Sequence, residues 1–216
     1  MVFELCSTNS VGNHFLAELR DVEIQKDSLR FRRNLERIGE LLAYELSKSF
    51  QYKPHVVKTP LGESPTYLIK NQLVVATILR AGLPFFNGFL NFFDDVPSGF
   101  VGAFRIPGTE GKDLGIQVEY VTTPDLNGKD LVVVDPMLAT GKSLVKSLNA
   151  LLDYGDPASI NVVSVICAPE GLDYVRQNTT REINLWTGCI DKELNEKDYI
   201  IPGLGDAGDL AFGQKV

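Results

Sequence analysis

The sequence predicts an α/β protein with a mostly parallel central sheet flanked by helices. Three apolar runs rich in β-branched residues, at 73–79, 131–134 and 160–168, are typical of strands buried on both faces. Helical patterns lie between these runs, and strands that alternate with helices favour a parallel sheet wound by right-handed crossovers. The 216 residues are enough for one such domain with a sizeable core, so we expect a single domain over 1–216.

Composition restricts the classes of partner. The formal net charge is −7, with 44% hydrophobic and 23% charged residues, which is ordinary for a soluble globular protein. A net negative charge argues against nucleic acid or an anionic membrane as the main partner. An anionic small substrate remains compatible with it, because exposed charges are screened beyond about 8 Å at physiological ionic strength.

Cysteine usage and apolar stretches indicate the compartment. Cys6, Cys167 and Cys189 are widely spaced and form no C-x-x-C pattern, so neither a disulfide framework nor a zinc site is indicated. Residues 1–5 lack the basic start and long apolar core of a signal peptide. The most apolar stretch, 83–93, is too short for a bilayer and is interrupted by polar residues, glycine and proline. We therefore expect a soluble, cytoplasmic protein.

The first 70 residues predict a helix and a hairpin. Residues 28–50 place apolar side chains at spacings of three and four, with charged residues between them, which predicts a long amphipathic helix packed on one face. Residues 52–68 contain Pro54, Pro60 and Pro65 and predict two short strands joined by a turn. Because too few residues remain there for a second core, we interpret 52–68 as a hairpin arm, with a partner subunit as its candidate contact.

Arginines follow two of the predicted strands. Arg80 comes directly after the strand at 73–79, and its planar guanidinium with five donors suits the oxygen array of a diphosphate, with a surface salt bridge as the alternative. Arg105 ends a further predicted strand at 99–105. The glycine-rich loop 106–115 that follows is a candidate lid, which would exclude water from a reactive site.

Between these two strands, residues 83–93 predict a helix that carries phenylalanine on all sides. A helix that is apolar all round must be covered by another part of a protein. The hydrophobic core is one candidate cover, and a homodimer interface is the other.

The segment 131–143 carries the clearest chemical signature. Its strand delivers Asp135 at the carboxyl end, which is where ligands bind in open α/β sheets. Small and hydroxyl residues then precede an amphipathic run, so backbone N–H groups and a helix N-terminus form a phosphate cradle, with an ordinary strand–turn–helix connection as the alternative. The cradle comprises Ala139, Thr140, Gly141, Lys142 and Ser143. A Walker A loop is excluded, because its required first glycine falls on Pro136.

A glycine-rich segment lies at 199–209. Gly203, Gly205 and Gly208 match the G-x-G-x-x-G dinucleotide fingerprint, but only eight residues follow Gly208, so no βαβ unit fits. The alternative that does fit is a loop whose backbone approaches a flat ligand without side-chain obstruction.

Three separated segments resemble the uracil phosphoribosyltransferases in the expected order. They are Ile-Leu-Arg-Ala-Gly-Leu at 78–83, Asp-Pro-Met-Leu-Ala-Thr-Gly at 135–141 and Tyr-Ile-Ile-Pro-Gly-Leu-Gly-Asp-Ala-Gly-Asp at 199–209. The resemblance extends from about Arg20 to Gly213. It implies a type I phosphoribosyltransferase fold in which residues 188–216 form a C-terminal base-binding hood.

The resemblance also implies an activity and a set of site residues. The reaction converts uracil and 5-phospho-α-D-ribose 1-diphosphate (phosphoribosyl diphosphate) to UMP and diphosphate, with Mg²⁺ held largely by substrate oxygens, in a homodimer or larger homo-oligomer. Asp135, Arg80 and Arg105 would be catalytic. Uracil would contact Ile200, Gly205, Asp206 and Ala207. Phosphoribosyl diphosphate would contact the cradle and also Arg80, Arg105, Asp135, Pro136, Met137, Leu138 and Asp206. The alternative is a catalytically inactive, nucleotide-sensing regulator with the same fold.

Two departures from the family pattern stand out. Lys142 occupies a position where these enzymes usually have a second glycine, and it either reaches the 5′-phosphate or stays in solvent while the backbone binds. Leu210 replaces a basic residue, a change expected to affect packing or an interface. His14 and His55 lie outside the motifs, so we assign no general base.

Overall fold

The computed structural model describes residues 1–106 and 115–214, with positions 104–106 and 115–116 described by their backbone alone. Across these residues one sheet has eight strands in the order β1-β10-β9-β7-β4-β5-β6, with β8 also paired to β9. All its pairs are parallel except β5–β6. The strands are β1 (Val2–Glu4), β4 (Leu73–Leu79), β5 (Ser98–Ile106), β6 (Gly115–Thr122), β7 (Asp130–Val134), β8 (Met137–Leu138), β9 (Ser159–Cys167) and β10 (Asn184–Ile190). The predicted mostly parallel α/β sheet is confirmed.

The three predicted apolar strands are neighbours at the centre of this sheet. They are β4, β7 and β9, and β7 lies between the other two. Alternate residues of these strands point to opposite faces. Val75, Val132 and Val163 belong to one hydrophobic core, whereas Val74, Val133 and Val162 belong to a second core on the other face. Their unbroken apolar sequence is therefore the result of burial on both sides.

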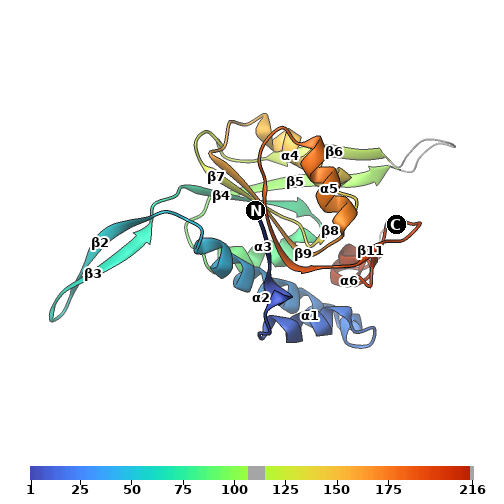
Figure 1. Cartoon of the computed structure of the whole chain (residues 1–216), viewed down its shortest axis with the longest axis horizontal. Helices are drawn as coiled ribbons and strands as arrows, with labels where there is room; N and C mark the ends of the chain where they lie inside the picture. The colour runs from blue at the N-terminus through green and yellow to red at the C-terminus, as the bar shows by residue number, and fades with distance from the viewer. Residues whose placement is uncertain (107–114, 215–216) are drawn as a thin grey trace.

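Helices cover both faces of the sheet (Figure 1). Packed on one face are α1 (Gly12–Arg20), α2 (Ser28–Ser47) and α3 (Gly82–Leu90), and on the other are α4 (Lys142–Leu152) and α5 (Pro169–Asn178). Two short 3₁₀ helices, η1 (Leu5–Ser7) and η2 (Ile24–Lys26), flank α1. The Asp27 carboxylate caps α2 by accepting hydrogen bonds from the N–H groups of Leu29 and Arg30.

Helices α2 and α3 pack unusually closely, because glycines meet at their crossing. A Cβ added to Gly88 would lie 2.2 Å from the Glu36 carbonyl oxygen, and one added to Gly39 would lie 2.4 Å from the Phe85 carbonyl oxygen. The close approach buries Phe85, Phe86 and Phe89 completely or almost completely. Core burial therefore covers most of the phenylalanine-rich helix.

The predicted arm is a separate two-stranded hairpin that projects from the body of the protein (Figure 1). Strands β2 (Tyr52–Thr59) and β3 (Gly62–Ile69) pair with each other and with no third strand of the described sheets. Every residue of β2 is exposed to solvent, and so are most residues of β3.

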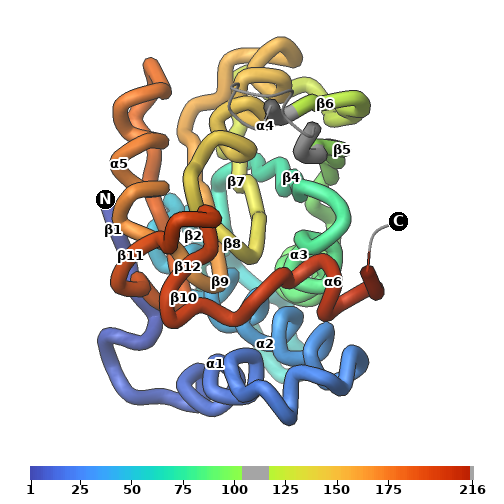
Figure 2. Tube along the Cα trace, turned by 90° about the vertical axis from the view of Figure 1, so that its right-hand side faces the viewer, coloured from blue at the N-terminus to red at the C-terminus, as the bar shows by residue number. Residues whose placement is uncertain are grey.

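The C-terminal segment crosses the carboxyl edge of the sheet. The hood contains β11 (Glu193–Leu194), β12 (Ile200–Ile201) and α6 (Ala207–Phe212), and its chain runs past the ends of the central strands toward α3 (Figure 2). This places the 199–209 segment beside the ends of β4 and β7. Over the described residues, no helix combines the length and the apolarity that crossing a membrane requires.

Candidate active site

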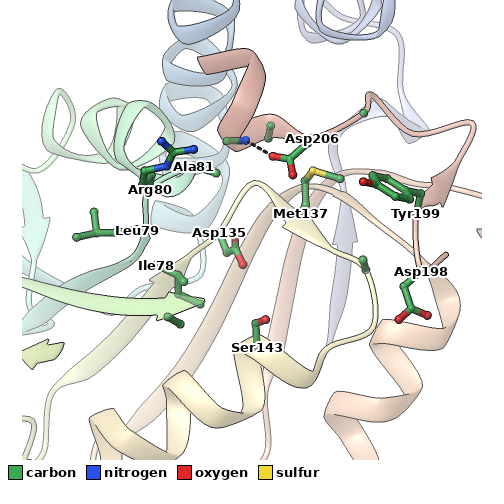
Figure 3. A pocket seen from close by; sticks show the side chains of 15 residues that line it. Ile78, Leu79, Arg80, Ala81, Asp135, Met137, Ser143, Asp198, Tyr199 and Asp206 are labelled. Carbon is green, nitrogen blue, oxygen red and sulfur yellow. Dashed lines mark hydrogen bonds between the residues drawn. The ribbon is translucent and has the colours of Figure 1, made fainter. Parts of the chain in front are cut away.

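A cavity of about 600 Å³ opens at the carboxyl edge of the sheet, between three segments far apart in the sequence (Figure 3). The first segment follows β4, the second follows β7, and the third belongs to the hood. The lining residues are Ile78, Leu79, Arg80, Ala81, Ala103, Asp135, Met137, Ala139, Ser143, Asp198, Tyr199, Gly205, Asp206, Ala207 and Gly208. The arginine, the central carboxylate and the glycine-rich segment therefore face one space.

Asp135 lies at the centre of the cavity, above Ser143 (Figure 3). Its backbone N–H donates to the Val163 carbonyl at 3.0 Å, which continues the parallel ladder beyond β7. Burial raises the pKa of Asp135 to about 7, and a hydrogen bond from the Met137 backbone N–H offsets part of that rise. Near neutral pH this carboxyl group is poised between its charged and neutral forms.

The cradle turns into α4 at Gly141. This residue has a φ of +76°, and an added Cβ would lie 2.8 Å from the Gly171 carbonyl oxygen, so the turn favours glycine. At the N-terminus of α4, Thr140 Oγ1 accepts a hydrogen bond from the Lys142 N–H at 3.4 Å. The first N–H groups of a helix have no partner within the helix, and they form a favourable site for an anion. Ser143, in the first turn, contributes its hydroxyl to the cavity wall.

Arg80 lies between the cavity and the C-terminal helix. Its Nη2 is 3.2 Å from the Gly213 carbonyl oxygen and 3.4 Å from Asp209 Oδ1, and its side chain is 43% exposed. The peptide bond between Leu79 and Arg80 is cis. The two interpretations of Arg80 are thus compatible, because the guanidinium lines the cavity and also contacts a carboxylate.

The hood presents backbone to the cavity. Gly205 has a φ of +91°, and Asp206 caps α6 by accepting hydrogen bonds from the N–H groups of Gly208 at 2.9 Å and Asp209 at 3.0 Å. The cap fixes the start of the helix, so the turn at 205–207 has a defined position against the cavity.

Comparison with known proteins agrees with this arrangement. A family model described as uracil phosphoribosyltransferase matches residues 6–214. The chain belongs to the uracil phosphoribosyltransferase family.

Relatives named uracil phosphoribosyltransferase cover almost the whole chain. One from Porphyromonas gingivalis is 46% identical over 215 residues, covering 100% of this chain and 99% of its own length. Another from Pyrococcus furiosus is 39% identical over 206 residues, covering 93% of this chain and 85% of its own length. A solved structure from Aquifex aeolicus superposes with a TM-score of 0.87 at 33% identity and covers 100% of both chains.

The structure brings most of the predicted site together, and it separates some residues from the cavity. Eight predicted residues line the cavity: Arg80, Asp135, Met137, Ala139, Ser143, Gly205, Asp206 and Ala207. Pro136, Leu138, Thr140, Gly141, Lys142 and Ile200 are not among its lining residues. Leu138 and Ile200 are each 3% exposed and pack in the hydrophobic cores, so their side chains support the site from behind.

Two predictions fall partly or wholly outside what the structure describes. Arg105 lies near the end of β5, where it is paired with Ile116 of β6, but its side chain is outside the described part. Of the predicted lid at 106–115, residues 107–114 are outside the described residues.

Seven lining residues had no predicted role, and two of them, Asp198 and Tyr199, carry polar side chains. Both belong to the turn between β11 and β12; Tyr199 lies beside Met137, and Asp198 lies farther from Asp206 than Tyr199 does (Figure 3). Asp198 has a φ of +62°, a conformation that non-glycine residues seldom adopt. The signal available in the sequence was the position of Tyr199 at the start of the 199–209 segment.

The raised pKa of Asp135 predicts a pH-dependent stability. Between about pH 4 and 7 the folded protein binds more protons at this group than the unfolded chain does. The free energy by which Asp135 destabilises the fold therefore increases as the pH rises through this range and is constant above about 7. Asp135→Asn removes this destabilisation, because the amide is neutral at every pH and its oxygen still accepts a hydrogen bond from the Met137 N–H. We expect this variant to be more stable than the wild type by up to about 4 kcal/mol at pH 8.

Thermal melts from pH 5 to 8.5 check this expectation. The difference in melting temperature between Asp135→Asn and the wild type should shrink toward pH 5. Asp94→Asn, which changes an exposed carboxylate, serves as the control and should show no such trend. A pH-independent difference for Asp135→Asn would contradict the assignment.

Proposed function

We propose that the chain is a uracil phosphoribosyltransferase, transferring the phosphoribosyl group from phosphoribosyl diphosphate to N1 of uracil to form UMP and diphosphate. The observation that carries the proposal is the convergence of Arg80, Asp135 and the 205–207 turn on one cavity, in a chain that the family model matches over 6–214.

The cavity has groups suited to each part of phosphoribosyl diphosphate. The N-terminus of α4 and the Ser143 hydroxyl suit the 5′-phosphate, because helix N-termini favour anions. The Asp135 carboxylate is an acceptor for ribose hydroxyl groups, and their hydrogen bonds would favour its charged form. Arg80 suits the diphosphate, because guanidinium donors match phosphate oxygens. Arg105 is proposed as a second diphosphate contact, because it lies near the carboxyl end of β5.

The hood suits the edge of a pyrimidine. Uracil presents an acceptor, a donor and an acceptor along O2, N3–H and O4, and a main-chain turn can present the complement. Gly205, Asp206 and Ala207 line the cavity, and Ile200 lies behind them in the core. Cytosine has the opposite pattern at N3 and C4, and each backbone group left unpaired in a dry site would cost about 1–3 kcal/mol. Main chain alone therefore provides selectivity for uracil.

The chemistry follows from charge. The C1–N1 bond forms as the bond from C1 to the diphosphate oxygen breaks, and the N1 proton is released. Positive charge develops on the ribose and negative charge on the departing diphosphate, so positioning and electrostatic stabilisation supply the catalysis. Arg80 offsets the negative charge on the leaving group. Asp135 orients the ribose, and its negative charge stabilises the positive charge that develops there.

We propose Mg²⁺ as a companion of the substrate. The oxygen donors of Asp135 and Asp206 line the cavity and are of the type that Mg²⁺ prefers, but the described residues contain no group of three or more His, Cys, Asp or Glu side chains that could hold a metal. The diphosphate and ribose oxygens would therefore supply most of its ligands. When bound, the ion would neutralise charge on the leaving group.

We further propose that the protein is a cytoplasmic homodimer held by its arm. All three cysteines are free thiols, as a reducing compartment favours. A lone two-stranded hairpin is marginally stable in water, yet β2 and β3 expose a series of large apolar side chains. These are Tyr52, Val56, Val57, Leu61, Tyr67 and Leu68. A second copy of the chain would cover them.

Substrate choice tests the central proposal. We expect diphosphate release from phosphoribosyl diphosphate with uracil, and at least about 100-fold lower kcat/KM with cytosine, hypoxanthine or orotate. The measurement is a coupled diphosphate assay with each base in turn. Tight binding of UMP without turnover of any base would instead support the nucleotide-sensing alternative.

Arg80→Ala tests the diphosphate contact. We expect the KM for phosphoribosyl diphosphate to rise by about 10- to 100-fold while the KM for uracil changes little, because a charge-assisted contact contributes about 1.5–3 kcal/mol. The control is Asp209→Asn, which disrupts the Arg80–Asp209 contact but retains the guanidinium. Equal losses for both substrates would count against the assignment.

Shortening the arm tests the dimer. In the variant, an Asn-Gly turn replaces residues 55–66 and joins Pro54 to Tyr67, which are paired in the hairpin. Sedimentation velocity should report a dimer for the wild type and a monomer for this variant. Val22→Asp, which changes another exposed apolar residue, should leave the dimer intact. A monomeric wild type, or a dimeric variant, would refute the proposal.

A further inference from the structure

A buried ion pair lies behind the hood, outside the lining of the cavity. Arg20, the last residue of α1, places Nη2 2.6 Å from Asp191 Oδ1 and Nη1 2.9 Å from Asp191 Oδ2. The Asp191 side chain is 3% exposed and the Arg20 side chain is 21% exposed. The contact is therefore bidentate and largely shielded from water, the geometry in which such pairs are strongest.

Both partners also hold the same residue of the hood. Arg20 Nη1 donates to the Gly203 carbonyl oxygen at 3.0 Å, and the Gly203 N–H donates to Asp191 Oδ2 at 3.0 Å. The peptide groups on the two sides of the Gly203 Cα are thus fixed by one guanidinium and one carboxylate. We call the three residues Arg20, Asp191 and Gly203 the clamp.

The clamp depends on glycine at its third position. Gly203 has a φ of +63°, and an added Cβ would lie 2.1 Å from the Ile200 carbonyl oxygen. No other residue type fits this turn without displacing the backbone. The chain is therefore folded into a conformation that presents its N–H and C=O groups toward Arg20 and Asp191.

The clamp is anchored to rigid parts of the fold. Asp191 follows β10 directly, and its N–H donates to the Cys167 carbonyl at the end of β9 at 2.8 Å. The next residue, Lys192, donates its N–H to the Ile201 carbonyl at 3.0 Å. The position of Gly203 is thus tied to the sheet on one side and to α1 on the other.

Gly203 precedes the cavity-lining turn at 205–207 by two residues. Gly205, Asp206 and Ala207 face the cavity, whereas neither Arg20 nor Asp191 is among its lining residues. Backbone groups cannot adjust by rotating a side chain, and N–H···O hydrogen bonds have distances of about 2.7–3.2 Å. A turn that recognises a ligand with its main chain must therefore be held in place from behind.

We propose that Arg20 and Asp191 are positioning residues for pyrimidine recognition, which hold Gly203 so that the 205–207 backbone meets the edge of the base. This inference rests on the proposed function. Under this inference, two residues that do not contact the substrate control the affinity for uracil and the selectivity against cytosine.

Conservative variants test the clamp. Arg20→Lys keeps the charge but replaces the rigid fork by a single ammonium group, which cannot reproduce the same fixed pattern of contacts with the carboxylate and the Gly203 carbonyl. Asp191→Asn keeps the shape and removes the charge. For both variants we expect the KM for uracil to rise by about 10- to 100-fold, with the KM for phosphoribosyl diphosphate within about threefold of wild type. Selectivity for uracil over cytosine should fall.

The matched control is Arg30→Lys. Arg30 also contacts both oxygens of a carboxylate, at 3.1 Å from each Glu18 oxygen, and this pair links α1 to α2 without touching the hood. For this control we expect a lower melting temperature, because the contact between α1 and α2 is weakened, and unchanged KM values for both substrates. An equal rise in the KM for uracil in the control would overturn the positioning role.

Amide hydrogen exchange gives a readout that does not depend on activity. In folded Arg20→Lys, peptides covering 199–206 should exchange faster than in the wild type, and peptides covering 135–143 should not. Unchanged exchange at 199–206 or an unchanged KM for uracil in this variant overturns the inference, even if Asp191→Asn fails to fold. A wild type that does not use uracil refutes the proposed function instead, and the exchange result then still decides whether the pair holds the turn.

Discussion

The structure depends on a carboxylate placed at the end of a buried central strand of the sheet. Strand β7 has neighbours on both sides and hydrophobic cores on both faces, so Asp135, which follows it, is enclosed by protein except on the side of the cavity. Burial raises its pKa to about 7, which means that the fold tolerates a group it would be more stable without. A destabilising group in a cavity is typical of a functional site, because contacts with a ligand can offset the stability that is lost by burying the group.

The register of the sheet explains why Arg80 and the Asp135 carboxylate line the same cavity. In the parallel pair β4–β7, Thr77 is opposite Val134, so Asp135 is level with Ile78 and Arg80 follows two residues later. The chain then turns at Gly82, where an added Cβ would lie 2.2 Å from Thr77 Oγ1. Two strands that end together thus deliver a cation and an anion to one edge, where both line a space large enough for a substrate.

Local sequence patterns predicted the central strands well, because burial on both faces leaves an unbroken apolar run. They were less exact at element ends. The helix predicted over 28–50 ends at Ser47, where the N–H groups of Lys48 and Ser49 bond three residues back rather than four, and Phe50 remains 8% exposed without being helical. Strand β1 was not predicted, because three residues that complete a sheet edge by pairing with β10 carry no pattern of their own.

The resemblance to a family located Arg80, Asp135 and the 205–207 turn, but it did not locate the clamp. Arg20 and Asp191 are 171 residues apart in the chain, and each is an ordinary charged residue within its local sequence. Their role arises only when α1, the end of β10 and Gly203 meet in space. Asp198 was missed for a similar reason: its positive φ is a property of the folded turn, and an aspartate at this position does not by itself predict that conformation.

The C-terminal helix connects the two ends of the cavity. Asp206, which lines the cavity, holds the start of α6 by accepting hydrogen bonds from the N–H groups of Gly208 and Asp209, and the Asp209 carboxylate contacts Arg80. The guanidinium also reaches the Gly213 carbonyl just beyond the same helix. A diphosphate that draws Arg80 into the cavity would therefore weaken contacts that hold α6. Because α6 is short and begins at the 205–207 turn, a shift of α6 would also move that backbone, so one helix connects the proposed diphosphate contact with the proposed base contact.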